Sequence, residues 1–218
     1  MKLYRTPSIL KTLFPNLIWD LKNNSREIYL TFDDGPIPGV TEYVLDILEK
    51  YKAKATFFCV GQNVETNTQI FQCILKQGHT IGNHTYDHLN GWKTRNGDYF
   101  QSISFCEKVF KENGYFPGKK YFRPPYGKIK LSQVRELQRD YRIIMWDLLS
   151  MDFDLKQTPE ECLEKTKKYT RPGSVIVFHD SLKTKNKIKF VLERLLDFLE
   201  TRDFHFRCLE EYVIKEGC

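Results

Sequence analysis

Short strand patterns alternate with helical patterns along almost the whole chain. Seven runs of β-branched, aromatic or apolar residues are expected to form strands, at 28–32, 55–60, 79–83, 121–122, 142–146, 174–178 and 204–208. The segments between them carry helical spacing or helix-ending residues, at 39–52, 70–77, 98–113, 132–139, 159–169 and 188–201. Such alternation predicts an α/β fold with a mostly parallel sheet, either closed as a barrel or open and doubly wound.

The residues at the strand ends favour the barrel. No Gly-x-Gly-x-x-Gly follows the first strand and no Gly-x-x-x-x-Gly-Lys-Ser/Thr is present, so nucleotide-binding open sheets lose support. Chemically active side chains instead fall at or just past strand ends, namely Asp33, Asp34, His84, Arg123, Asp152 and His179. Barrel enzymes carry their chemistry on that face. A length of 218 residues fits one domain of this kind.

The charge distribution does not indicate a polyanionic partner. The chain carries 34 Lys and Arg against 28 Asp and Glu, a net charge of +6, but the basic residues are scattered. The densest basic run, 183–189, is expected to be a solvated loop that leads into a helix. We therefore expect no nucleic-acid partner, and the sequence leaves the oligomeric state open.

Hydropathy and cysteine spacing argue against a membrane protein, a disulfide-rich protein and a cysteine-bound zinc site. No run approaches the eighteen or so apolar residues of a membrane span, and the N-terminus lacks the continuous apolar core of a signal peptide. The cysteines, at 59, 73, 106, 162, 208 and 218, form no Cys-x-x-Cys pair. These patterns predict a cytoplasmic protein with no membrane span, no disulfide framework and no thiolate zinc site.

The stretch 28–36 ends a buried strand with two adjacent carboxylates. Asp33 and Asp34 precede the turn signal Gly35-Pro36, and neighbouring residues of an extended chain point apart. One carboxylate can therefore hold a metal while the other acts as a base on a metal-activated water. A solvated Asx turn is the alternative.

His84 and His88 form a second candidate element. If residues 84–88 coil as a helical turn, both imidazoles lie on one face and reach one cation. Thr85 stands where the zinc-protease motif has its glutamate, so protease chemistry lacks its base. With Asp34, the set is two histidines and one carboxylate, an open arrangement typical of catalytic zinc. Two histidines on a polar surface turn remain the alternative.

Five short segments of the chain match the sequence motifs of a known family. These segments are Thr31-Phe32-Asp33-Asp34-Gly35-Pro36, His84-Thr85-Tyr86-Asp87-His88, Arg123-Pro124-Pro125-Tyr126-Gly127, Asp152-Phe153 and Val177-Phe178-His179. In this order they resemble the motifs of the polysaccharide deacetylases of carbohydrate esterase family four, the chitooligosaccharide deacetylase homology domain. The resemblance implies a single-domain, distorted (β/α)7 barrel over 27–218. Residues 1–26, which include Pro7, Pro15 and several apolar side chains, are expected to form an arm packed on the barrel. It also implies a divalent metal, most often Zn²⁺ with Co²⁺ or Ni²⁺ as alternatives, and an acetylated oligo- or polysaccharide as substrate.

The same resemblance implies a role for each motif residue. Asp34, His84 and His88 are expected to bind the metal. Asp33 is expected to be the general base, and Arg123 to keep it ionised. Tyr126 is expected to offer its backbone N–H to the developing oxyanion. His179 is the expected general acid, with Asp152 orienting it and raising its pKa.

Two residues depart from the family pattern. Phe153 replaces a usual Trp and Val177 replaces a usual Leu, and both keep an apolar wall for the substrate. Because the fourth motif is weakened, Asp147 and Asp154 compete with Asp152 for its role.

The sequence thus predicts a metal-dependent hydrolase that removes acetyl groups from N-acetylglucosamine-containing glycans. An O-acetyl esterase of xylan or another glycan, and a non-catalytic carbohydrate-binding barrel, are the alternatives. Trp92, Tyr99 and Tyr126 are candidates for stacking on sugar rings, or else for core packing.

Overall fold

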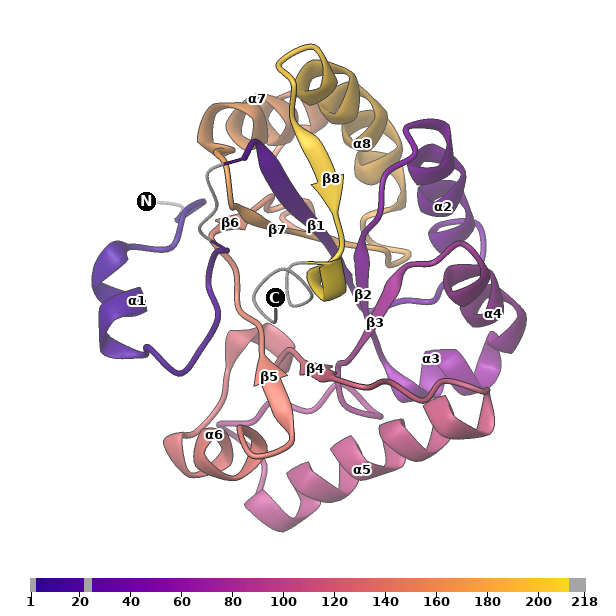
Figure 1. Cartoon of the computed structure of the whole chain (residues 1–218), viewed down its shortest axis with the longest axis vertical. Helices are drawn as coiled ribbons and strands as arrows, with labels where there is room; N and C mark the ends of the chain where they lie inside the picture. Colours follow the sequence, from indigo (N-terminus) through magenta and orange to yellow (C-terminus); the bar gives the residue numbers. More distant parts are fainter. Residues whose placement is uncertain (1–2, 22–24, 212–218) are drawn as a thin grey trace.

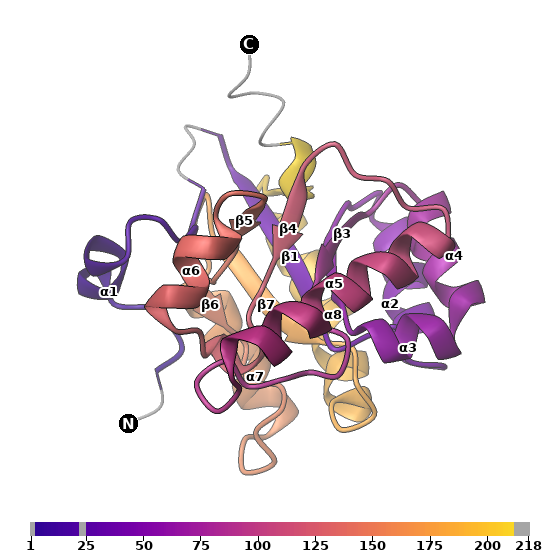
Figure 2. The ribbon, with the colours of Figure 1, turned by 90° about the horizontal axis from the view of Figure 1, so that it is seen from below.

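A single parallel sheet, curved into an incomplete barrel and surrounded by helices, forms the body of the molecule (Figures 1 and 2). The computed structural model describes residues 3–21 and 25–211. The strands follow the order β5-β4-β3-β2-β1-β7-β6, and β8 pairs with the first half of β1. Their bounds are Glu27–Asp33 (β1), Thr56–Cys59 (β2), Thr80–Asn83 (β3), Lys120–Phe122 (β4), Tyr141–Ile143 (β5), Leu148–Leu149 (β6), Val175–His179 (β7) and His205–Arg207 (β8).

Helices follow most of the strands, as the alternation predicted, although the first helix precedes β1 and no helix lies between β5 and β6. The helices are Ser8–Leu13 (α1), Thr41–Lys50 (α2), Gly61–Thr66 (α3), Thr68–Lys76 (α4), Asn96–Glu112 (α5), Leu131–Leu137 (α6), Pro159–Tyr169 (α7) and Lys185–Glu200 (α8), with a 3₁₀ turn at Pro125–Gly127. The distorted (β/α) barrel is confirmed. The sequence missed α1 and α3, whose six residues are too short to display a helical period, and β6, which has only two residues.

The alternation of side chains along β1 builds two separate apolar layers. Ile28, Leu30 and Phe32 pack outward against the helices, whereas Tyr29 packs inside the barrel. All seven residues of β1 are buried. The same alternation turns Asp33, at the carboxyl end of β1, toward the barrel interior.

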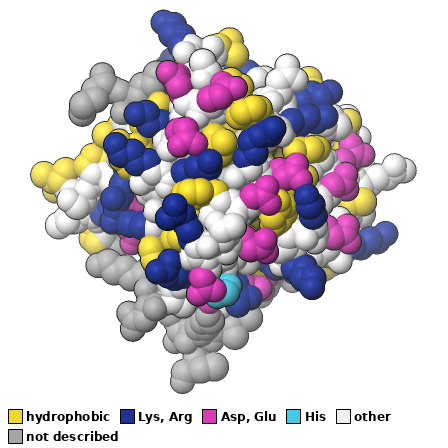
Figure 3. Space-filling model, turned by 90° about the horizontal axis from the view of Figure 1, so that it is seen from above, with side chains coloured by type: hydrophobic (Ala, Val, Ile, Leu, Met, Phe, Trp, Pro, Cys, Tyr) yellow, Lys and Arg dark blue, Asp and Glu magenta, His cyan; other side chains and the backbone are white. Residues whose placement is uncertain are grey.

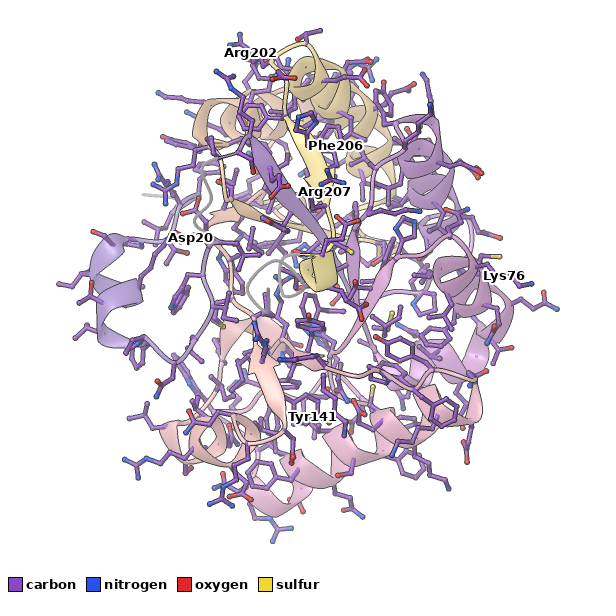
Figure 4. All side chains as sticks on the ribbon, in the orientation of Figure 1. Asp20, Lys76, Tyr141, Arg202, Phe206 and Arg207 are labelled. Carbon is purple, nitrogen blue, oxygen red and sulfur yellow. The ribbon has the colours of Figure 1, made fainter. Side chains whose placement is uncertain are left out.

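The arm before β1 runs along the gap between β5 and β6, which do not pair with each other in the described part of the chain. The Ile18 N–H donates to the Ile143 carbonyl at 2.9 Å, and the Leu149 N–H donates to the Tyr4 carbonyl at 2.8 Å. Asp20, labelled in Figure 4, lies on this arm. The arm therefore provides backbone partners for strands that lack a neighbour there.

An ion cluster ties the arm to the barrel. The carboxylate of Asp147, which is fully buried, receives the Lys11 ammonium, the Arg171 guanidinium at 2.8 Å and the Ser174 hydroxyl at 2.8 Å. Asp20 contacts the same Lys11 and Arg171. Because these groups occupy Asp147, its environment is that of a structural ion pair.

Charges of both signs are mixed over the face shown in Figure 3, and neither sign forms a continuous patch there. Lys50 of α2 forms an ion pair with Glu193 of the neighbouring helix α8. The basic run 183–189 leads into α8, which begins at Lys185 rather than at the expected residue 188. Among the described helices, none is long and apolar enough to cross a membrane.

Candidate active site

Asp33 and His179 meet at the carboxyl end of the sheet. They are the last residues of the neighbouring parallel strands β1 and β7 and stand directly opposite each other in the register. Asp34 follows in a left-handed conformation, with φ 84°. This turn sends the second carboxylate away from the first, so the two acids face different partners, as the sequence predicted.

Arg123 crosses the barrel interior to reach Asp33. Its Nη1 donates to Asp33 Oδ1 at 2.6 Å and to Thr31 Oγ1 at 2.7 Å, while Nη2 donates to the Met145 carbonyl at 2.8 Å. Its guanidinium carbon lies 4.1 Å from the centre of the Phe58 ring. Burial lowers the Arg123 pKa and the Asp33 charge opposes that effect. A fully buried cation with this many partners can hold an anion in one place.

Asp34, His84 and His88 converge on one point. Asp34 Oδ1 lies 3.2 Å from His88 Nε2 and 3.8 Å from His84 Nε2. Two tetrahedral ligands that are each about 2.1 Å from an ion lie roughly 3.4 Å apart. The three donor atoms therefore fit a single small divalent cation.

The Nδ1 atom of each histidine, on the other side of the ring from Nε2, makes a hydrogen bond with the protein. His84 Nδ1–H donates to the Arg123 carbonyl at 2.7 Å, and His88 Nδ1 shares a hydrogen bond with the Tyr126 hydroxyl at 3.1 Å. Such partners orient the ring and leave Nε2 for a metal. Burial lowers the His84 pKa to about 4, which keeps this imidazole neutral at ordinary pH.

The protonation state of Asp34 also suits metal binding. Burial alone raises the Asp34 pKa, but the hydrogen bond with His88 and the positive charges of the neighbouring histidines in their protonated forms, His179 first, outweigh burial. The net result is a pKa below the usual range. Asp34 is thus an ionised carboxylate, which is the protonation state that a metal ligand requires.

The segment 84–88 is not a helical turn, so that expectation was wrong. It is a loop in which Thr85 and His88 adopt left-handed φ angles of 63° and 57°. Asn83 Oδ1 accepts the Thr85 N–H at 2.9 Å, and Thr85 Oγ1 accepts the Leu89 N–H at 3.0 Å. These side-chain bonds replace a helical ladder and still bring the two imidazole centres within 5.1 Å.

Asp152, rather than its competitors, contacts His179. Its Oδ1 accepts His179 Nδ1–H at 2.8 Å and its Oδ2 accepts the His179 backbone N–H at 2.7 Å. Burial lowers the His179 pKa, but the Asp152 charge and hydrogen bond outweigh burial and raise the pKa to about 9. Asp147 lies in the ion cluster of the arm, and Asp154 Oδ1 accepts the Lys156 backbone N–H at 2.9 Å.

These groups line one hollow of about 250 Å³ at the carboxyl end of the barrel. The ionisable side chains of Asp33, Asp34, His84, His88 and His179 line it. Its apolar wall is made by Trp146, Leu149, Phe153 and Val177. The exposed side chains of Tyr126 and Lys183 also line it. The Phe153 ring lies 5.2 Å from the His179 ring and packs edge to face with it.

Backbone strain is concentrated around this hollow. Seven described residues other than glycine have a positive φ, and four of them, Asp34, Thr85, His88 and Tyr126, belong to the site. Such conformations cost free energy and persist where the surroundings enforce them. Strain at these positions is consistent with a functional constraint on the loops.

Sequence reasoning missed the residues that support the Asp34 turn. The buried Asp180 carboxylate accepts the Gly35 N–H at 3.0 Å and the Thr41 hydroxyl at 2.5 Å, and burial raises the Asp180 pKa to about 8. Asn63 Nδ2 donates to the Asp34 carbonyl at 2.6 Å. The only available signal for Asp180 was its position directly after His179, which also fits a capping residue.

Three comparisons connect this geometry to known proteins. The family model for polysaccharide deacetylases matches residues 20–144. A peptidoglycan-N-acetylglucosamine deacetylase of Bacillus cereus is 32% identical over 207 residues, with 89% of this chain and 92% of that protein covered. A chitooligosaccharide deacetylase of Azorhizobium caulinodans is 32% identical over 164 residues, with 73% and 76% covered.

A solved structure extends the likeness to the fold. The crystal structure of a peptidoglycan N-acetylglucosamine deacetylase in complex with a 4-naphthalen-1-yl-N-oxidanyl-benzamide matches with a TM-score of 0.87 and 29% identity. The match covers 95% of this chain and 96% of that one. The chain therefore belongs to the polysaccharide deacetylase family, a family of hydrolases.

Proposed function

We propose that the protein removes acetyl groups from N-acetylglucosamine residues of a glycan by metal-dependent hydrolysis. One observation carries the proposal. A carboxylate held by a buried arginine and a histidine held by a buried aspartate end neighbouring strands, and the Asp34, His84 and His88 donors share their hollow. Amide hydrolysis needs a base for water and an acid for the leaving nitrogen, and these two residues supply that pair.

Asp33 is the proposed base and His179 the proposed acid. The attacking water gives its proton to Asp33 as its oxygen bonds to the acetyl carbonyl carbon. The carbon–nitrogen bond then breaks as the carbonyl re-forms, the nitrogen takes the Nε2 proton of His179, acetic acid leaves, and the proton on Asp33 returns to His179 through solvent. Because Nδ1–H of His179 is already donated to Asp152, only Nε2 is available to the substrate.

Asp34, His84 and His88 are the residues that would hold the cation. Two imidazole nitrogens and one carboxylate oxygen suit Zn²⁺, with Co²⁺ and Ni²⁺ as alternatives. A divalent cation bound there lowers the pKa of water and polarises the carbonyl group. The backbone N–H of Tyr126 is proposed to stabilise the oxyanion.

The hollow suits an acetyl group on a sugar. Phe153 and Val177 belong to its apolar wall, against which a methyl group can pack, while Asp33 and His179 lie on the polar side. The two relatives named above act, by their names, on N-acetylglucosamine of peptidoglycan and on chitooligosaccharides. We therefore propose an N-acetylglucosamine-containing glycan as the substrate.

Acetate release tests the proposal directly. The protein is stripped of metal, and release is then measured from chitooligosaccharides, peptidoglycan and acetylated xylan, each with and without added zinc. We expect zinc-dependent release from at least one of the two amide substrates. Release from xylan alone would replace the proposal with an esterase. Release from none of them, in protein that holds its zinc, would refute it in favour of a binding role.

A further inference from the structure

Trp92 is an exposed aromatic residue that the proposed chemistry does not use. Of the three aromatic residues that the sequence offered for sugar stacking, Tyr99 is fully buried and Tyr126 contacts His88. Trp92 is 60% exposed. Its indole therefore presents a large apolar face to solvent beside a polar ring nitrogen, a combination that is enriched in binding surfaces.

The Trp92 ring is held in one orientation. Its Nε1–H donates to the Ile129 carbonyl at 2.9 Å, and its backbone N–H donates to Asn90 Oδ1 at 3.0 Å. The Lys128 ammonium lies 5.7 Å from the ring centre. A ring fixed before a ligand arrives loses little conformational freedom on binding.

The segment around Trp92 packs closely against the segment 128–133, which holds the indole ring. Gln133 Nε2 donates to the Gly91 carbonyl at 3.1 Å, and the Lys130 ammonium donates to the Thr94 carbonyl at 2.6 Å. A Cβ on Gly91 would come within 2.5 Å of the Lys128 carbonyl oxygen. The contact leaves no room for a side chain there, so the position of the indole is set by backbone packing.

Trp92 and Ile129 follow, a few residues along the chain, residues that line the hollow. Trp92 follows His88 by four residues, so their Cα atoms are at most about 14 Å apart. Ile129, which holds the indole, follows Tyr126 and Gly127, and both of these line the hollow. A glycan whose acetyl group enters the hollow therefore has its neighbouring sugars within reach of this surface.

We propose that Trp92, with the Lys128 ammonium over one face of its ring, forms a second sugar subsite that binds a pyranose ring of the glycan chain outside the hollow. A β-linked hexosamine presents a face of C–H bonds that packs on the indole, and its hydroxyl or acetamido oxygens accept from the Lys128 ammonium. The ligand class is a chain of N-acetylated sugars rather than a monosaccharide. This inference rests on the proposed glycan substrate.

Chain-length dependence of catalysis tests the subsite. The ratio of kcat/KM for chitopentaose to kcat/KM for chitobiose is measured in the wild type and in Trp92→Ala, Trp92→Phe and Phe116→Ala. Phe116 is the matched control, because it is 73% exposed but precedes β4, at the opposite end of the barrel. We expect the ratio to fall about fivefold in Trp92→Ala, to fall less in Trp92→Phe, and to stay unchanged in Phe116→Ala.

The outcomes separate this inference from the proposed function. Acetate release with the same ratio in all variants would overturn the subsite and leave the deacetylase proposal standing. If the wild type releases no acetate, the proposed function fails, and calorimetric titration with chitopentaose decides the subsite alone. Weaker chitopentaose binding in Trp92→Ala than in Phe116→Ala would then support the subsite, and equal binding would overturn it.

Discussion

Replacing Asp152 by asparagine should move the alkaline limit of activity. The change removes the negative charge that faces His179 and nearly preserves the shape of the side chain. The His179 pKa is raised from an ordinary 6.5 to about 9, with Asp152 as the largest cause that raises it. That difference corresponds to about 3 kcal/mol in favour of the protonated imidazole. Because burial lowers the pKa, we expect the variant to titrate near or below its ordinary value.

The sign of the effect follows from the role of an acid. A general acid works in its protonated form, so kcat/KM should fall as pH rises through the His179 pKa. At about pH 7.5 the wild-type imidazole is almost fully protonated, whereas only about a tenth would be protonated in Asp152→Asn. The variant should therefore lose about tenfold in kcat/KM at that pH and recover most of this loss at about pH 6.

The same shift has a consequence for stability. A folded-state pKa raised above the unfolded one contributes stability that is complete below about pH 6.5 and is lost as pH rises through about 9. The wild type should lose this contribution to the free energy of unfolding across that window. Asp152→Asn should show little such dependence from His179.

Two measurements check the prediction, with Asp154→Asn as the control for removal of a negative charge two residues further along the chain. The pH profile of acetate release gives the alkaline limit, and NMR titration of the histidine ring protons gives the His179 pKa directly. An Asp152→Asn variant whose limit stays near pH 9 would refute the argument. A control that shifts as far as Asp152→Asn would refute the specific role of Asp152.

Three further predictions concern the metal, the base and the Asp34 turn. His88→Ala should lose bound zinc and activity together, whereas His205→Ala, at an exposed histidine, should keep both; elemental analysis that finds full zinc in His88→Ala would contradict the ligand assignment. Asp33→Asn should fold and bind zinc normally but release acetate at least about a hundredfold more slowly, and wild-type rates would exclude the base role. Gly35→Ala should lower the free energy of unfolding by about 3 kcal/mol in urea titration, because its Cβ would lie 2.0 Å from Asp180 Oδ2. Gly97→Ala, whose Cβ meets nothing within 4 Å, is the control, and equal destabilisation of both would argue against the clash.

Local sequence patterns were sufficient where the physics is local. β1 is apolar throughout and closes with Asp33, so burial and alternation both follow from residues 27–33. α7 was predicted with its observed bounds, because Thr158 and Glu161 form a capping box around Pro159. Family motifs then indicated which strand-end residues belong together.

Other features depend on contacts between distant segments. The helical turn expected at 84–88 failed because Asn83, Thr85 and Ser102 supply side-chain hydrogen bonds that hold a loop instead. β6 was missed because its two residues gain strand geometry by pairing with β7 on one side and with the arm on the other.

The sequence by itself determined the order of the longer strands and helices, the barrel and the residue types of the candidate site. Hydrophobic periodicity and motif order are properties of short segments, so they can be read without coordinates. Only the tertiary structure selected Asp152 over Asp147 as the partner of His179 and separated the exposed Trp92 from the buried Tyr99. Each of these outcomes depends on which carboxylate, cation or ring the fold brings within a few ångströms, and no local pattern encodes that distance.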